Sequence, residues 1–140
     1  MPMRFVALVA CLMGCAAASP RSGLPSPDRV VGCLEFRVRE IADDTAADLG
    51  LVALDYEFAN RCRAAVALDL SRMEVAALSA EGEARLLAAH DPRGEIRAGV
   101  LDGHSRGREV IGYGPVANAK QLCINLPDGT EALCFRRGAP

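Results

Sequence analysis

The sequence predicts an all-β domain that follows a short N-terminal segment. The first observation is an alternation of residue types, in which Leu34, Phe36 and Val38 are apolar and charged residues stand between them. Because successive side chains of a strand point to opposite faces, this pattern is typical of an antiparallel strand with one buried face. The second observation is that such stretches recur, with Gly, Pro or Asp turn residues between them. The third is an even set of four cysteines in the same region, which predicts disulfides.

The candidate strands continue to the C-terminus. We expect them at 34–39, 52–58, 66–70, 85–89, 95–101, 109–113, 121–126 and 130–135. Turn signals separate them, among them Asp91-Pro92-Arg93-Gly94 and Pro127-Asp128-Gly129. Seven or eight short strands within residues 30–136 are typical of an immunoglobulin-like antiparallel β-sandwich.

Two segments have some helical character. Ser71 and Glu74 have the spacing of a helix capping box, so residues 73–80 fit either a strand, which we prefer, or a short helix. Residues 42–48 are a candidate for a helical turn between the first two strands.

The N-terminus has the layout of an export signal. Arg4 precedes an apolar run from Phe5 to Gly14, which is shorter than the roughly 20 residues of a membrane-spanning helix. The run ends in Leu12-Met13-Gly14-Cys15, which resembles the lipobox of bacterial lipoproteins. The resemblance implies cleavage before Cys15, a diacylglycerol on its sulfur and usually a third acyl chain on its amine. Ala16 in the second mature position then implies an outer-membrane address. The alternatives are an ordinary secretory signal and a buried core helix.

These features divide the chain into four parts. Residues 1–14 are the predicted signal peptide, and 15–29 are the acylated cysteine with a flexible linker rich in Pro, Ser and Ala. Residues 30–136 form the predicted β-sandwich, and 137–140 are a tail. The 55–60 stretch followed by 66–70 also resembles small immunoglobulin-like domains of bacterial envelope lipoproteins.

The hydrophobic pattern around Pro127-Asp128-Gly129 predicts the register of a hairpin. Apolar residues of paired strands must share one face of the sheet. This requirement places Ile124 opposite Leu133 and Leu122 opposite Phe135, which corresponds to a four-residue loop. A three-residue loop would shift the register by one.

The same register predicts a disulfide. It places Cys123 opposite Cys134 on the other face, at a separation that a disulfide can bridge. If lipid occupies Cys15, Cys33 and Cys62 form the second disulfide by elimination. The alternatives are a metal site or a redox pair, but no Cys-x-x-Cys occurs and the spacings are wide for zinc.

Gly103-His104-Ser105-Arg106-Gly107 matches the Gly-x-Ser-x-Gly string of α/β-hydrolases. In that family the string joins a strand to a helix, and the catalytic histidine follows the serine in the chain. Here Gly112, Gly114 and Pro115 disfavour a helix, and no histidine follows Ser105. A glycine-rich turn is therefore the preferred interpretation, and we expect no catalytic residue.

The remaining composition excludes several classes of function. No arginine cluster or basic stripe predicts nucleic-acid binding, and the chain has a net charge of −2. His90 and His104 each lie beside a turn without a third ligand at a convincing spacing, so no metal site and no cofactor are expected.

The predicted protein is a lipid-anchored, non-enzymatic envelope lipoprotein, most consistent with the outer membrane. It would act as a structural or protein-binding module, held to the membrane through Cys15 and presented to another envelope protein. The alternatives are a small-ligand carrier that uses the space between the sheets, and a serine acyl hydrolase that uses Ser105. The sequence indicates no oligomeric state.

Overall fold

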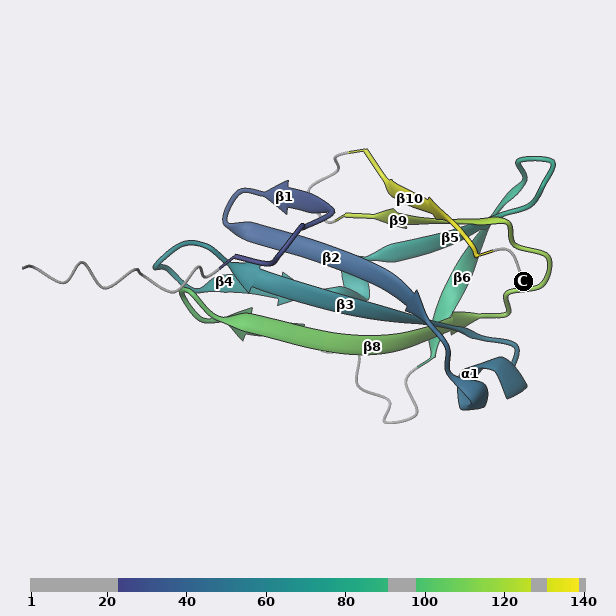
Figure 1. Ribbon diagram of the computed structural model, residues 1–140, viewed down its shortest axis with the longest axis horizontal. Helices are drawn as coiled ribbons and strands as arrows, with labels where there is room; N and C mark the ends of the chain where they lie inside the picture. The colour runs from purple at the N-terminus through teal and green to yellow at the C-terminus, as the bar shows by residue number, and fades with distance from the viewer. Residues whose placement is uncertain (1–22, 91–97, 127–130, 139–140) are drawn as a thin grey trace, which may run out of the picture.

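The computed structural model describes residues 23–90, 98–126 and 131–138 as a mostly β-structure (Figure 1). Its elements are β1 (Arg29–Val31), β2 (Leu34–Ile41), α1 (Asp44–Asp48), β3 (Val52–Asn60), β4 (Val66–Asp69), η1 (Leu70–Arg72), β5 (Glu74–Leu78), β6 (Ala84–His90), β7 (Ala98–Leu101), β8 (Arg106–Gly114), β9 (Gln121–Asn125) and β10 (Leu133–Arg136). The predicted all-β class is confirmed.

The strands form one curled sheet and one small one. The large sheet has eight strands in the order β1-β2-β3-β8-β6-β5-β9-β10, and β4 pairs with β7 in the small one. All of these pairs are antiparallel. Strand β6 connects the two halves of the large sheet, because its first residues pair with β5 and its last residues pair with β8.

The curl brings the two edges of the large sheet together (Figure 1). Arg29 on β1 donates from Nη1 to the carbonyl oxygen of Glu131 at 2.8 Å, just before β10. Arg137, just after β10, donates from Nη2 to Glu40 Oε1 of β2 at 2.8 Å. The large sheet is thus barrel-like, and these side-chain bonds lie where it curls back on itself. The immunoglobulin-like topology stays a prediction.

The core lies between the β2–β3–β8 part of the sheet and the β5–β9 part. Phe36 and Phe58 pack edge to face with ring centroids 5.5 Å apart. The hydroxyl groups of Tyr56 and Tyr113 form a buried hydrogen bond of 2.8 Å. The other buried apolar residues include Leu34, Val38, Val52, Leu54, Leu70, Met73, Val75, Ala77, Ile111, Ala119, Leu122, Ile124 and Leu126.

Within the segment 73–80, residues Glu74–Leu78 form a strand rather than a helix. Strand β5 lies between β6 and β9 and pairs with both, so its backbone groups are satisfied by sheet hydrogen bonds. Val75 and Ala77 are buried while Glu74 is exposed, as period two requires. Of the two capping-box residues, Ser71 belongs to the short 3₁₀ turn η1 and Glu74 is the first residue of β5. The expected helical turn at 42–48 is confirmed as α1, whose N-cap Asp43 accepts a hydrogen bond from the amide of Ala46 at 2.9 Å.

The described end of the predicted linker lies against the sheet. The amide of Leu24 donates to Glu35 Oε2 at 2.5 Å, and Asp28 Oδ2 accepts from the amide of Val38 at 2.8 Å. Arg37 donates to the carbonyl oxygen of Pro25 at 3.1 Å. Side chains of β2 thus bind the backbone of Leu24 and Pro25, and the side chain of Asp28 binds the backbone of β2. Figure 1 shows the segment crossing β2 before it enters β1.

Candidate functional site

The predicted lipidation residue Cys15 and the predicted signal peptide lie outside the described residues. The described chain starts at Gly23. The candidate site is therefore the end of the domain at which the chain from Cys15 enters the described structure. We call this the tether-side end and define it as Gly23–Pro25, the loop 61–65 and the turn 102–106. Figure 1 shows the loops between β3 and β4 and between β7 and β8 at this end.

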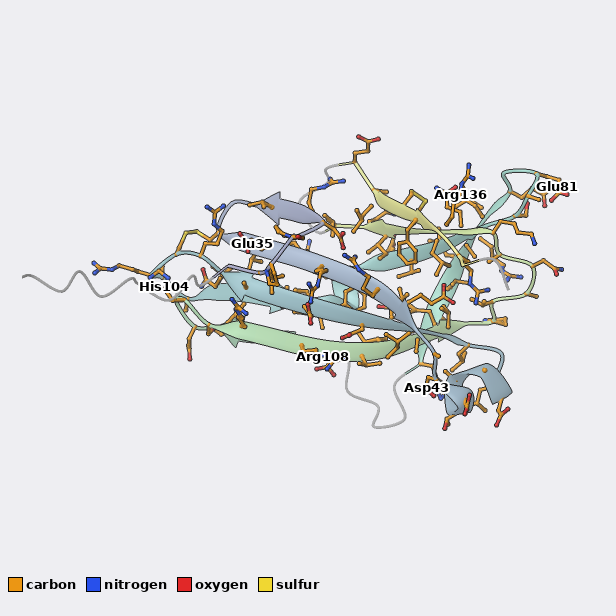
Figure 2. The ribbon with its side chains drawn as sticks, viewed as in Figure 1. Glu35, Asp43, Glu81, His104, Arg108 and Arg136 are labelled. Carbon is orange, nitrogen blue, oxygen red and sulfur yellow. A yellow bond between two sulfur atoms is a disulfide. The ribbon has the colours of Figure 1, made fainter. Side chains whose placement is uncertain are left out.

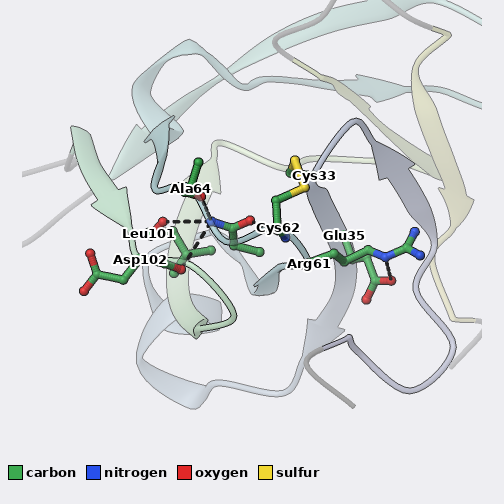
Figure 3. Close-up of a disulfide and its surroundings, with 8 residues drawn as sticks. Cys33, Glu35, Arg61, Cys62, Ala64, Leu101 and Asp102 are labelled. Carbon is green, nitrogen blue, oxygen red and sulfur yellow. Dashed lines mark hydrogen bonds and ion pairs between the residues drawn. A yellow bond between two sulfur atoms is a disulfide. The ribbon is translucent and has the colours of Figure 1, made fainter. Parts of the chain in front are cut away.

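A disulfide joins two loops of the tether-side end. Cys33 and Cys62 are bonded with a Cα–Cα distance of 5.4 Å, which is the pairing expected by elimination. The amide of Arg61 also donates to the carbonyl oxygen of Cys33 at 2.8 Å. The amide of His104 donates to the carbonyl oxygen of Cys62 at 3.0 Å. The disulfide fixes the turn before β2 to the loop after β3, and the hydrogen bond from His104 attaches the turn before β8 to that loop (Figure 3).

Asn60 is a buried polar hub two residues before Cys62 of this disulfide. Its partners Ala64, Leu101 and Asp102 are labelled in Figure 3. Its side chain is fully buried, and Nδ2 donates to the carbonyl oxygens of Ala64 at 2.7 Å, Leu101 at 3.1 Å and Asp102 at 3.2 Å. Its Oδ1 accepts from the amide of Cys62 at 3.0 Å. This role of Asn60 was not predicted from the sequence. Its place in the strand could have indicated the role, because Asn60 continues the inward-facing series of Tyr56 and Phe58. A polar side chain that faces the core needs hydrogen-bond partners inside the protein.

The first three residues of the Gly-x-Ser-x-Gly string lie in the turn between β7 and β8, and its last two begin β8. The Ser105 hydroxyl donates to the carbonyl oxygen of Asp102 at 2.6 Å, and the amide of Ser105 donates to the same oxygen at 3.2 Å. Strand β8 begins at Arg106, where the hydrolase arrangement requires a helix. The geometry around Ser105 is thus that of a hydrogen-bonded turn.

Position 103 requires glycine because the backbone of Arg63 leaves no room for a side chain, and not because of a catalytic role. Replacing it by alanine is expected to destabilise the domain by about 3 kcal/mol. A Cβ at this position would lie 2.0 Å from the carbonyl oxygen of Arg63, so the turn would have to move away from the Asn60 hub. Urea unfolding would measure the loss. Gly99→Ala is the matched control, because nothing lies within 4 Å of a Cβ there, and equal free energies for the two variants would contradict this explanation.

The tether-side end carries an arginine-rich surface above a buried carboxylate. Glu35 is only 7% exposed, and its Oε1 lies 3.4 Å from Nε of Arg61 (Figure 3). Arg106 donates from Nη2 to the carbonyl oxygen of Gly23 at 2.5 Å. Three arginines of this end are exposed, namely Arg61, Arg63 and Arg106. The arrangement can bind anionic groups, while Glu35 is committed to internal contacts.

The other predicted residues lie elsewhere. Cys123 and Cys134 form a disulfide with a Cα–Cα distance of 4.1 Å. Ile124 faces Leu133 and Cys123 faces Cys134, so the predicted register is confirmed, whereas the loop 127–130 lies outside the described residues. His90 is exposed at the end of β6 and is not brought to the tether-side end. Within the described part of the chain, no three His, Cys, Asp or Glu side chains gather closely enough to hold a metal ion.

No helix among residues 23–90, 98–126 and 131–138 has the length and apolar character that crossing a membrane requires. Comparison of the sequence with known protein families, curated proteins and solved structures finds no match.

Proposed function

We propose that this protein is a lipid-anchored lipoprotein of the bacterial envelope, most consistent with the outer membrane, in which Cys15 carries the acyl chains. The observation that carries the proposal is an export-type N-terminus in the same chain as a domain with two disulfides. Disulfides persist in oxidising compartments such as the bacterial periplasm. Gly23 follows Cys15 by eight residues (23 − 15), which span at most about 28 Å. An acylated Cys15 would therefore keep the folded domain close to the lipid headgroups.

Mass analysis of the protein isolated from its native host tests the anchor. Without reduction, we expect an N-terminal peptide that begins at Cys15 and carries the added mass of acyl chains. The same digest should contain Cys33 linked to Cys62 and Cys123 linked to Cys134. A water-soluble protein that still begins at Met1 would contradict the proposal.

Within the envelope, we propose a non-enzymatic structural or protein-binding role for an immunoglobulin-like domain. The short attachment would present strands and loops of the domain to a neighbouring envelope protein. Cross-linking followed by affinity purification from detergent-solubilised envelope tests this role. We expect a partner that is recovered with the native protein and lost with Cys15→Ala, because that variant would no longer be held at the membrane. Recovery of no partner with the native protein would count against a binding role.

A groove favours small-ligand carriage as a second candidate function. Aromatic side chains such as Tyr56 and Phe58 fill the interior, whereas an open groove of about 720 Å³ lies at the surface beside the start of β9 and the end of β10. Lys120 and Arg136 line this groove together with polar residues, which suits an anionic ligand. Native mass spectrometry of the purified protein should then detect a bound small molecule that Lys120→Glu releases. Mass spectra without bound ligand would contradict carriage.

A further inference from the structure

We propose that the tether-side end is a docking surface for anionic phospholipid headgroups, which holds the domain end-on to the membrane. This proposal rests on the proposed lipid anchor. It adds a second, electrostatic contact between the folded domain and the bilayer, and it assigns the end of the domain that faces the lipid.

The charges at this end favour an anionic surface. Its exposed residues include Arg61, Arg63 and Arg106, and the exposed acidic residue among them is Asp102. Glu35 is buried and faces Arg61 and the amide of Leu24 instead of solvent. Basic residues next to a membrane are attracted to anionic lipids, and the attraction decays within a Debye length of about 8 Å at physiological salt.

The next charges along the sheet cancel in pairs. Arg108 donates to both carboxylate oxygens of Asp55, at 2.7 and 2.8 Å, and Arg37 is paired with Glu57. They neither add to the positive charge of the tether-side end nor remove it. At the tether-side end, Arg61 is likewise paired with Glu35. Three arginines there stand against the two carboxylates of Glu35 and Asp102, so the end keeps a net charge of +1 (3 − 2).

The opposite end of the domain has the opposite sign. Figure 2 shows His104 at one end of the long axis and both Asp43 and Glu81 at the other. The exposed acidic residues at this far end are Asp43, Asp44, Asp48, Glu81 and Glu83, and they outnumber the exposed cations Arg85, Lys120 and Arg136. A negatively charged membrane would attract the arginine-rich end and repel the acidic end, which favours a single orientation.

The backbone that carries these arginines is also fixed before any lipid binds. Arg61 adjoins Cys62 of the disulfide, the carbonyl oxygen of Arg63 packs against Gly103, and Arg106 is bonded to Gly23. A charged surface on a fixed framework loses little conformational freedom on contact. The bond from Arg106 places its charge next to Gly23, on the side of the domain from which the chain leads back to Cys15.

Tryptophan reporters can locate the end that touches the membrane, because the chain contains no tryptophan. Ala64→Trp marks the tether-side end, and Ala80→Trp marks the far end; both positions are exposed. The full chain with Cys11→Ser would be coupled through the Cys15 thiol to a maleimide lipid. Vesicles of brominated phosphatidylcholine, with and without phosphatidylglycerol, would then quench any tryptophan at the bilayer surface.

We expect quenching of the Ala64→Trp reporter on vesicles with phosphatidylglycerol, and weak quenching on vesicles without it. The Ala80→Trp reporter should stay unquenched on both. Adding Arg63→Glu should reduce the ratio of docked to undocked domains roughly fivefold for each unit of charge changed. The matched control Arg85→Glu, at the far end, should leave the quenching of the Ala64→Trp reporter unchanged. High salt should abolish the phosphatidylglycerol dependence.

Equal quenching of the two reporters would overturn the proposed docking surface. So would quenching that changes neither with phosphatidylglycerol nor with Arg63→Glu. Because the maleimide bond replaces the natural attachment, this result does not depend on acylation of Cys15. A failure of the anchor would be seen in the mass of the N-terminal peptide and not in the quenching.

Discussion

Loss of both disulfides is expected to unfold the domain under otherwise native conditions. The Cys33–Cys62 disulfide closes a sequence separation of 29 residues and Cys123–Cys134 one of 11. Chain-entropy arguments give about 3.6 and 2.8 kcal/mol for loops of these lengths. The two loops do not overlap, so their contributions should add to about 6 kcal/mol. Small domains have net free energies of unfolding of about 5–15 kcal/mol. A loss of about 6 kcal/mol therefore equals the entire stability of a domain at the lower end of that range.

Denaturant unfolding followed by circular dichroism would measure this loss. The variant with all four cysteines replaced by alanine should be largely unfolded without denaturant, and each paired replacement should remain folded. Replacing Cys33 and Cys62 should cost more than replacing Cys123 and Cys134, because the first pair closes the longer loop. A reversed order, or a fully stable protein without disulfides, would show that the strand pairing alone holds the domain.

The part of the fold that follows period two could be predicted from the sequence. Leu122, Ile124, Leu133 and Phe135 define an apolar face, and only one register keeps them together. That register placed Cys123 and Cys134 correctly, because disulfide geometry and strand pairing are local properties of one hairpin. The same reasoning located β2 and β3, whose apolar residues alternate over their full length.

The contacts that shape the tether-side end could not be predicted in this way. Asn60 binds carbonyl oxygens 41 and 42 residues further along the chain, and no local pattern reports such a distance. The alternation along β2 predicts that Glu35 faces solvent, yet its carboxylate contacts Leu24 and Arg61. The curl of the sheet likewise depends on which strands meet across β6, which alternation along each strand does not determine.

Raising the pH above about 10 is expected to unfold the domain through its two tyrosines. Tyr56 and Tyr113 are buried, and their hydroxyl groups bond to each other at 2.8 Å. Burial raises the pKa of Tyr56 far above its usual value of 10, and the neighbouring Tyr113 adds to the shift. Burial also raises the pKa of Tyr113, partly opposed by its hydrogen bond with Tyr56. The folded protein therefore keeps both phenols neutral at a pH where the unfolded chain ionises.

The sign of the pH dependence follows from proton binding. Below pH 10 both states hold the two phenolic protons, so stability is unaffected by these groups. Above pH 10 the unfolded chain releases them while the folded protein retains them, so stability falls as the pH rises. Each tyrosine lowers the stability by up to about 1.4 kcal/mol per pH unit, over the range in which the unfolded chain has lost its phenolic proton and the folded protein retains it.

Tyrosinate absorbance measures this process selectively, because the chain has two tyrosines and no tryptophan. We expect the absorbance to rise in the same transition in which the circular dichroism of the sheet is lost. The double variant Tyr56→Phe/Tyr113→Phe removes both hydroxyl groups together and so leaves no unpaired partner in the core. It should keep its stability to higher pH. Tyrosinate that forms near pH 10 in a protein with unchanged circular dichroism would show that the buried pair opens to solvent without unfolding.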